Sequence, residues 1–179
     1  MRVIPWTAED AFPLVLGLID GILTTLTLAS GRVIRGTDDL TWGLALRIAG
    51  ASSLASGFVF FAAEYTRVRG TLVREGRQLN LPVRGHLAST RMGRAGLQDA
   101  AGRAALSSGA NLVGAFVPLL VAVLYPRYSW VSILIALGLL AGLGLLVARA
   151  VAGRWVRWSA GLALAGFALA MIGAEINIV

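Results

Sequence analysis

The chain has 179 residues, of which 57% are hydrophobic and 14% charged, and it contains no cysteine. Soluble domains carry about 25% charged and about 45–50% apolar residues, so this composition excludes a soluble globular enzyme. The lack of cysteine excludes a disulfide scaffold and a zinc–thiolate site. The formal net charge is nevertheless +7, and all 16 basic residues are arginine. Such a charge indicates either nucleic acid or an anionic membrane surface as a partner, and the apolar blocks of this chain favour the membrane.

A helix that crosses a hydrocarbon core of about 30 Å needs about 20 mostly apolar residues. Five segments of the sequence have this length and composition, at 12–30, 43–64, 105–124, 130–150 and 157–175. All five tryptophans lie at or just before the start of a segment, as aromatic side chains at the membrane–water interface do. We therefore expect an all-α integral membrane protein, with five transmembrane helices in a single membrane domain.

The arginines divide unevenly between the two sides of this predicted topology. Twelve lie at the N-terminus, in the segment 65–104 and in the turn at 149–157, against three on the opposite side. Positively charged residues gather on the cytoplasmic side of membrane proteins. We therefore predict a cytoplasmic N-terminus and an outside C-terminus, in a multi-pass protein of a prokaryotic cell membrane.

The segment 65–104 is the largest piece outside the predicted spans, and it holds eight of the arginines. Its glycines and Pro82 argue against one long helix, whereas short helices at 65–79 and 86–103 fit the pattern. With too few apolar residues for a core of its own, it is predicted to be a cytoplasmic helical connection rather than a domain. No aromatic residues interleave its arginines, so it indicates contact with anionic lipid headgroups and not with nucleic acid.

Asp20 lies close to the middle of the first span, about 12 Å from its start at 1.5 Å per residue. Helical spacing places it on one face with Gly17, Thr24 and Thr27, and Gly21 follows it directly. Ionisable residues inside a membrane are expensive and mark ion or proton pathways. The alternative is a structural carboxylate that bonds to a neighbouring helix, with Gly17 and Gly21 allowing close packing.

Weaker polar patterns occur in the second and third spans. Ser53 and Gly57 share a face of the second span, which ends at Glu64. Glu64 either collects cations at the cytoplasmic mouth or only pairs with a neighbouring arginine. In the third span Asn111 and Pro118 fall on one face, and Pro118 is expected to kink the helix.

Arg47 lies inside the second span, where a charged side chain is energetically costly unless it is paired or reaches water. Its side chain can extend back to the outer surface and meet Glu175. Alternatively it pairs with Asp20, which would neutralise that carboxylate. The sequence leaves both pairings open.

Four of the spans resemble helices of the vacuolar iron transporter family. The first helix of that family carries a Gly-x-x-Asp-Gly element, which here reads GLIDG at 17–21. Glu9 matches an acidic position at the cytoplasmic mouth in plant members. The run AALSSGANLVGAFVPLLVAVLYP resembles the third helix with its Gly-x-x-x-Pro-Leu element, and further runs resemble the second and last helices.

The resemblance implies a homodimer whose first two helices line a path for Fe²⁺ or Mn²⁺, which is exchanged for protons. Asp20 would bind the ion, and Glu9 and Glu64 would gather ions at the inner mouth. The residues expected to supply further oxygen contacts are Thr24, Thr27, Ser53 and Asn111. The chain departs from the family at Leu54, where the second helix typically offers a Met, and at the arginines that replace a Glu-rich domain of plant members. Oxygen ligands without a thioether suit harder cations such as Mn²⁺.

Two functions follow as expectations. The first is a transporter that moves Fe²⁺ or Mn²⁺ out of the cytoplasm in exchange for protons. The alternative is a family-derived membrane protein without metal transport, either structural or carrying another small solute. We do not expect an enzyme or a resident cofactor, because the sequence lacks paired catalytic carboxylates and a Ser/His or Cys/His arrangement, and its single histidine is His86.

Overall fold

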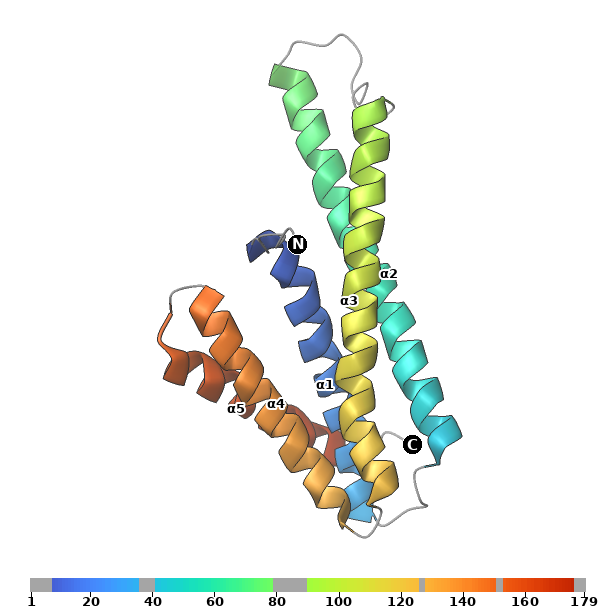
Figure 1. Cartoon of the computed structure of the whole chain (residues 1–179), viewed down its shortest axis with the longest axis vertical. Helices are drawn as coiled ribbons and strands as arrows, with labels where there is room; N and C mark the ends of the chain where they lie inside the picture. Colours follow the sequence, from blue (N-terminus) through green and yellow to red (C-terminus); the bar gives the residue numbers. More distant parts are fainter. Residues whose placement is uncertain (1–7, 36–40, 79–89, 126–127, 151–152, 176–179) are drawn as a thin grey trace, which may run out of the picture.

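The computed structural model describes residues 8–35, 41–78, 90–125, 128–150 and 153–175, and in these ranges it is all-helical (Figure 1). The helices are α1 (Ala8–Arg35), α2 (Trp42–Gln78), α3 (Arg91–Leu124), α4 (Ser129–Ala150) and α5 (Trp155–Glu175). Each of them is long and apolar enough to cross a membrane. This confirms the expected all-α fold with five candidate membrane spans.

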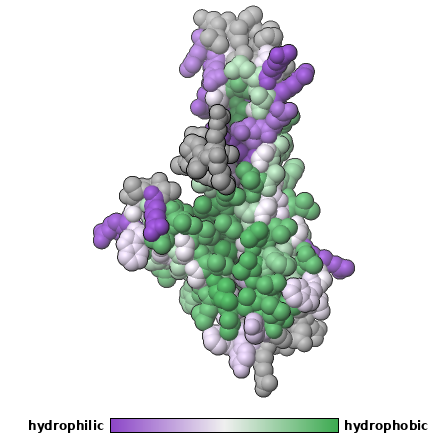
Figure 2. Space-filling view, viewed as in Figure 1, coloured by the Kyte–Doolittle hydropathy of each residue, from purple (hydrophilic) through white to green (hydrophobic). Residues whose placement is uncertain are grey.

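Apolar side chains cover much of the outer surface of the helices. Leu54 and Phe58 of α2 are 76% and 73% exposed, and Leu164 of α5 is 67% exposed. On the face drawn in Figure 2, apolar side chains cover the lower body of the molecule, and most of the strongly hydrophilic side chains lie on the upper part. An apolar surface of this extent is unsuited to water and fits a lipid surround.

α2 and α3 are longer than the spans predicted within them. They have 37 and 34 residues, which is about 55 Å and about 50 Å at 1.5 Å per residue, well beyond a hydrocarbon core of about 30 Å. The short helices expected at 65–79 and 86–103 are therefore continuous with α2 and α3. We call residues 65–78 and 91–104 the α2–α3 extension; it projects past the start of α1 (Figure 1).

The glycines of the extension lie within continuous helices. One of these glycines, Gly96, contributes to the packing of α3 against α2. A Cβ on Gly96 of α3 would lie 2.5 Å from Cγ1 of Val68 of α2, so glycine allows the two helices to approach closely. Leu72 of α2 is buried in the same region. The cost of a glycine in a helix interior, about 1 kcal/mol, is offset by this contact.

α1 packs along α3 through glycines on both helices. A Cβ on Gly17 would collide with the carbonyl group of Ser107, and one on Gly21 with the carbonyl group of Asn111. From the other side, a Cβ on Gly114 would lie 2.6 Å from a carbonyl oxygen of α1. Small residues at a helix interface allow this close backbone approach in membranes.

Two apolar clusters hold the remaining helices together. One joins α1 to α4 and α5 and contains Ile22, Leu26, Ala136, Leu140, Leu143 and Ala170. The other joins α2 to α3 and contains Ala45, Ala49, Ala115 and Leu119. α1 and α2 thus each pack along α3, whereas they meet one another at only a few positions.

Candidate functional site

A groove of about 970 Å³ lies between α1 and α2, where the two helices make few direct contacts. On α1 its residues recur every fourth position, which places them on one helix face; they are Phe12, Leu16, Asp20, Thr24 and Leu28. On α2 the lining includes Ile48, Ala51, Ser52, Ala55, Ser56, Val59, Phe60, Ala63, Glu64 and Arg67. The wall is therefore mostly apolar. Its polar side chains are Asp20, Thr24, Ser52 and Ser56, together with Glu64 and Arg67 at one end.

Asp20 is held by a polar network that spans three helices. Nδ2 of Asn111 in α3 donates a hydrogen bond to Oδ2 of Asp20 at 2.8 Å. Oδ1 of Asn111 accepts a hydrogen bond from Oγ of Ser52 in α2 at 3.1 Å. Thr24 Oγ1 donates to the Asp20 backbone carbonyl at 2.8 Å and lies 3.4 Å from Ser52 Oγ.

Proton counting shows which oxygens in this network stay available. A hydroxyl group carries one proton, and those of Thr24 and Ser52 are used on the Asp20 carbonyl and on Asn111. Both hydroxyl oxygens therefore keep lone pairs close to one another. No described residue donates to Oδ1 of Asp20, so the groove offers a carboxylate oxygen and two hydroxyl oxygens.

The glycine beside Asp20 explains why Asn111 reaches it. Asn111 is fully buried in α3, and its backbone carbonyl is the group that a Cβ on Gly21 would strike. Glycine at that position lets α1 approach so closely that the Asn111 amide and the Asp20 carboxylate meet. The Gly17-to-Gly21 element thus sets the geometry of the carboxylate and not only the helix packing.

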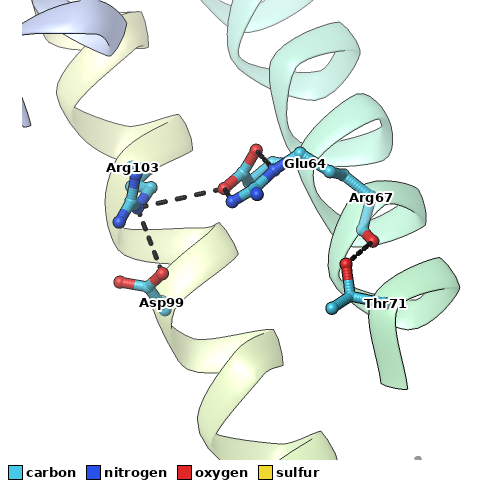
Figure 3. A network of polar contacts seen from close by, with 5 residues as sticks. All are labelled: Glu64, Arg67, Thr71, Asp99 and Arg103. Carbon is cyan, nitrogen blue, oxygen red and sulfur yellow. Dashed lines mark hydrogen bonds and ion pairs between the residues drawn. The ribbon is translucent and has the colours of Figure 1, made fainter. Parts of the chain in front are cut away.

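Glu64 also lines the groove, and it forms ion pairs with two arginines (Figure 3). Arg67 donates from Nη2 to Oε1 at 2.6 Å and from Nε to Oε2 at 2.9 Å. Arg103 of α3 has its Nε 3.9 Å from Oε1 of Glu64 and 3.1 Å from Oδ2 of Asp99. Glu64 follows Ser52 by twelve residues, or about 18 Å along the helix, so it does not join Asp20.

Two residues expected in the path lie at helix interfaces instead of in the groove. Ser53 of α2 donates to the Ser108 carbonyl at 2.7 Å, and Ser108 donates to the Ser53 carbonyl at 2.9 Å. Thr27 donates to a carbonyl of its own helix and packs where a Cβ on Gly173 of α5 would lie 2.6 Å from its carbonyl oxygen. Gly57 faces Ser108 in the same α2–α3 contact.

The remaining sequence-based candidates are placed as follows. Pro118 is buried within α3, and the helix continues past it. The side chain of Glu9 lies outside the described residues. Leu54 does not line the groove, and the ion pairs among the described residues join Arg47 neither to Asp20 nor to Glu175. In the same part of the chain, no three His, Cys, Asp or Glu side chains come together in a group that could hold a metal ion.

Ser52 is the groove residue that the sequence pattern missed. The sequence pattern predicts its neighbour Ser53, which shares a face with Gly57, but that face packs against α3. The signal for Ser52 is its spacing with Ala55, Ser56, Val59 and Ala63, which form the small-residue face of α2 toward the groove.

Comparison with protein-family models, curated proteins and solved structures gives no match to this chain. The function is therefore argued from the groove itself. Its distinguishing chemistry is the Asp20 carboxylate, which a buried amide positions and which makes no ion pair with any described residue, in a wall that is otherwise largely apolar.

Proposed function

We propose that the protein is a membrane transporter that carries a cation along the α1–α2 groove, moving Fe²⁺ or Mn²⁺ out of the cytoplasm in exchange for protons. The observation that carries this proposal is the Asp20 carboxylate: Asp20 lines the groove, Asn111 bonds to one of its oxygens, and no described residue donates to the other. An ionisable group within a membrane span is costly, and its usual role is on an ion or proton pathway.

The exchange rests on competition at one carboxylate. Asn111 occupies Oδ2, so a proton or a cation would bind at Oδ1, and the hydroxyl oxygens of Thr24 and Ser52, which line the same groove, would supply further contacts. A protonated carboxyl group has no charge with which to retain a cation, so protonation releases the ion. Ligands of this hard oxygen type suit Mn²⁺ better than softer metals.

The proposal includes the homodimer and the topology expected from the sequence. One Asp20 supplies a single negative charge, and a second copy facing the groove would supply another for a divalent ion. The α2–α3 extension would face the cytoplasm of a prokaryotic cell, because its arginines obey the positive-inside rule. Its base would then be the inner mouth, where Glu64 lies and where Glu9 of α1 is expected.

The test is transport in proteoliposomes with an imposed pH gradient, with Mn²⁺ or Fe²⁺ followed by quenching of an enclosed metal-sensitive dye. We expect wild-type protein to move the metal and Asp20→Asn to lose at least tenfold in rate. Asp99→Asn is the matched control, because it removes a carboxylate outside the groove, and it should transport as wild type. Transport by Asp20→Asn at the wild-type rate would show that the mechanism is wrong.

A second candidate is a membrane protein of this type without metal transport, either structural or carrying another small solute. The observation that favours it is the pairing of Glu64 with Arg67 and Arg103, which removes the negative charge expected at one end of the groove. Wild-type vesicles that move neither Mn²⁺ nor Fe²⁺ under any pH gradient would support this candidate.

A further inference from the structure

The charges that line the groove leave a single uncompensated negative group. Among the described lining residues, the charged side chains are Asp20, Glu64 and Arg67. Arg67 makes a two-point ion pair with Glu64, so these two cancel. No ion pair to Asp20 occurs among the described residues. The groove therefore carries one net negative charge, which one monovalent cation would neutralise.

The size and the wall of the groove fit an organic ligand. Its volume of about 970 Å³ lies at the upper end of the range of about 300–1,000 Å³ that is typical of small-molecule sites. Such sites have mostly apolar walls with a few polar groups that fix orientation. Here Phe12, Leu16, Val59 and Phe60 supply apolar surface, and Ala55 leaves open space between the helices.

We infer that the groove binds a lipophilic organic monocation, such as a quaternary ammonium or phosphonium with aromatic substituents. Its charge would lie against Oδ1 of Asp20, and its apolar body against the side chains of Phe12 and Phe60. A monocation neutralises the groove, whereas a divalent ion bound to one carboxylate leaves an excess positive charge beside an apolar wall, which is costly.

This inference goes beyond metal transport, since it requires neither a second carboxylate nor a second copy of the chain. Entry from the bilayer is open to a lipophilic cation, because such an ion partitions into lipid and the groove lies among lipid-facing helices. A metal ion lacks that route. The two ligand classes share Asp20 but differ in their need for the apolar wall, which makes them separable by mutation.

The experiment is equilibrium dialysis of radiolabelled tetraphenylphosphonium against the purified full-length protein in detergent. We expect saturable binding by wild type, at least tenfold weaker binding by Asp20→Asn, and no saturable binding by Ala55→Trp, which fills the groove while keeping the carboxylate. Ala165→Trp, at an exposed position of α5, is the matched control and should bind as wild type. The neutral triphenylphosphine oxide should show no saturable binding.

The inference is overturned if wild type gives no saturable binding, as it would with a lipid or a second copy seated in the groove. It is also overturned if Asp20→Asn or Ala55→Trp binds as tightly as wild type. Metal transport is measured in parallel on the same proteins. Phosphonium binding without Mn²⁺ or Fe²⁺ transport refutes only the proposed function, and metal transport without phosphonium binding refutes only this inference.

Discussion

Asn111 determines the arrangement around Asp20, because its amide serves two helices at once. Its Nδ2 donates to Asp20 of α1 and its Oδ1 accepts from Ser52 of α2, and the side chain is fully buried. An amide suits this place because it offers donors at one end and an acceptor at the other. A leucine of similar size offers neither, and an aspartate would place a second carboxylate against the first.

Replacing Asn111 should therefore destabilise the folded protein. We expect Asn111→Leu to lower the free energy of unfolding by about 1–3 kcal/mol, since it leaves Asp20 and Ser52 without their partner. Leu112→Ala is the control at the next residue, which is 41% exposed, and it should change stability by about 0.5 kcal/mol or less. Unfolding in detergent micelles measures both. Equal stability of Asn111→Leu and wild type would contradict the role given to this amide.

The sequence singles out Asp20 and Asn111, which bond directly to one another, but not Ser52, whose hydroxyl group donates to Asn111. An aspartate in an apolar span is conspicuous in the sequence, because a charge inside a membrane is expensive. Ser52 and Ser53 differ by about 100° around α2, and only the position of α3 decides which of them faces the groove. Thr27 shares a helix face with Asp20 but lies about 10 Å further along α1, where it meets α5. These assignments depend on the tertiary packing of the helices, and the periodicity of the sequence carries no information about that packing.

At the scale of the helix, the contact of α1 with α3 depends on positions that accept no side chain. A Cβ on Gly21 meets the backbone of α3, which cannot move aside as a flexible side chain could. We expect Gly21→Ala to destabilise the protein by about 1–3 kcal/mol through overpacking. Gly109→Ala is the control, because nothing lies within 4 Å of its added Cβ, and it should be neutral or stabilising by up to about 1 kcal/mol. Thermal unfolding of the two variants measures both changes in stability. A Gly21→Ala variant as stable as wild type would contradict the close contact of α1 with α3.

The helices α2 and α3 extend beyond the spans predicted within them. The predicted spans begin or end near residues 64 and 105, because hydropathy falls there. Hydropathy reports the edge of the bilayer, however, and a helix continues past that edge wherever its residues still pack. The burial of Leu72 and the contact of Gly96 with Val68 supply such packing. The number and order of the helices were predictable, whereas the continuity of α2 and α3 through the extension was not.

The base of the extension offers a measurable coupling between α2 and α3 through Glu64 and Arg103. Because Arg103 is 22% exposed and its Nε is 3.9 Å from Glu64, the interaction should be weak, about 0.2–1 kcal/mol. A double-mutant cycle of Glu64→Gln and Arg103→Gln in chemical unfolding gives the value. The coupling should decrease in part at high salt, since ions screen a partly exposed pair less than a fully exposed one. A coupling of zero, or one that salt leaves unchanged, would contradict an ionic link here.

At the scale of the whole molecule, the charge asymmetry predicts the orientation in the membrane. The natural chain has no cysteine, so single cysteines report accessibility without background. We expect Thr71→Cys, on the extension, to react with a membrane-impermeant maleimide only after cells are permeabilised. Tyr125→Cys, at the opposite end of α3, should react in intact cells. The reverse pattern would show that the N-terminus faces outward.

The α2–α3 extension also has a kinetic consequence for whatever enters the groove at its base. Seven arginines against Glu75 and Asp99 create a positive potential that lowers the local concentration of cations at that end. A potential of one kT per charge reduces a monovalent cation about threefold and a divalent one about sevenfold. Entry of a cation from the arginine-bearing side should therefore be slower at low ionic strength and should recover when salt is added. The extension would act as an electrostatic barrier that slows divalent cations more than monovalent ones.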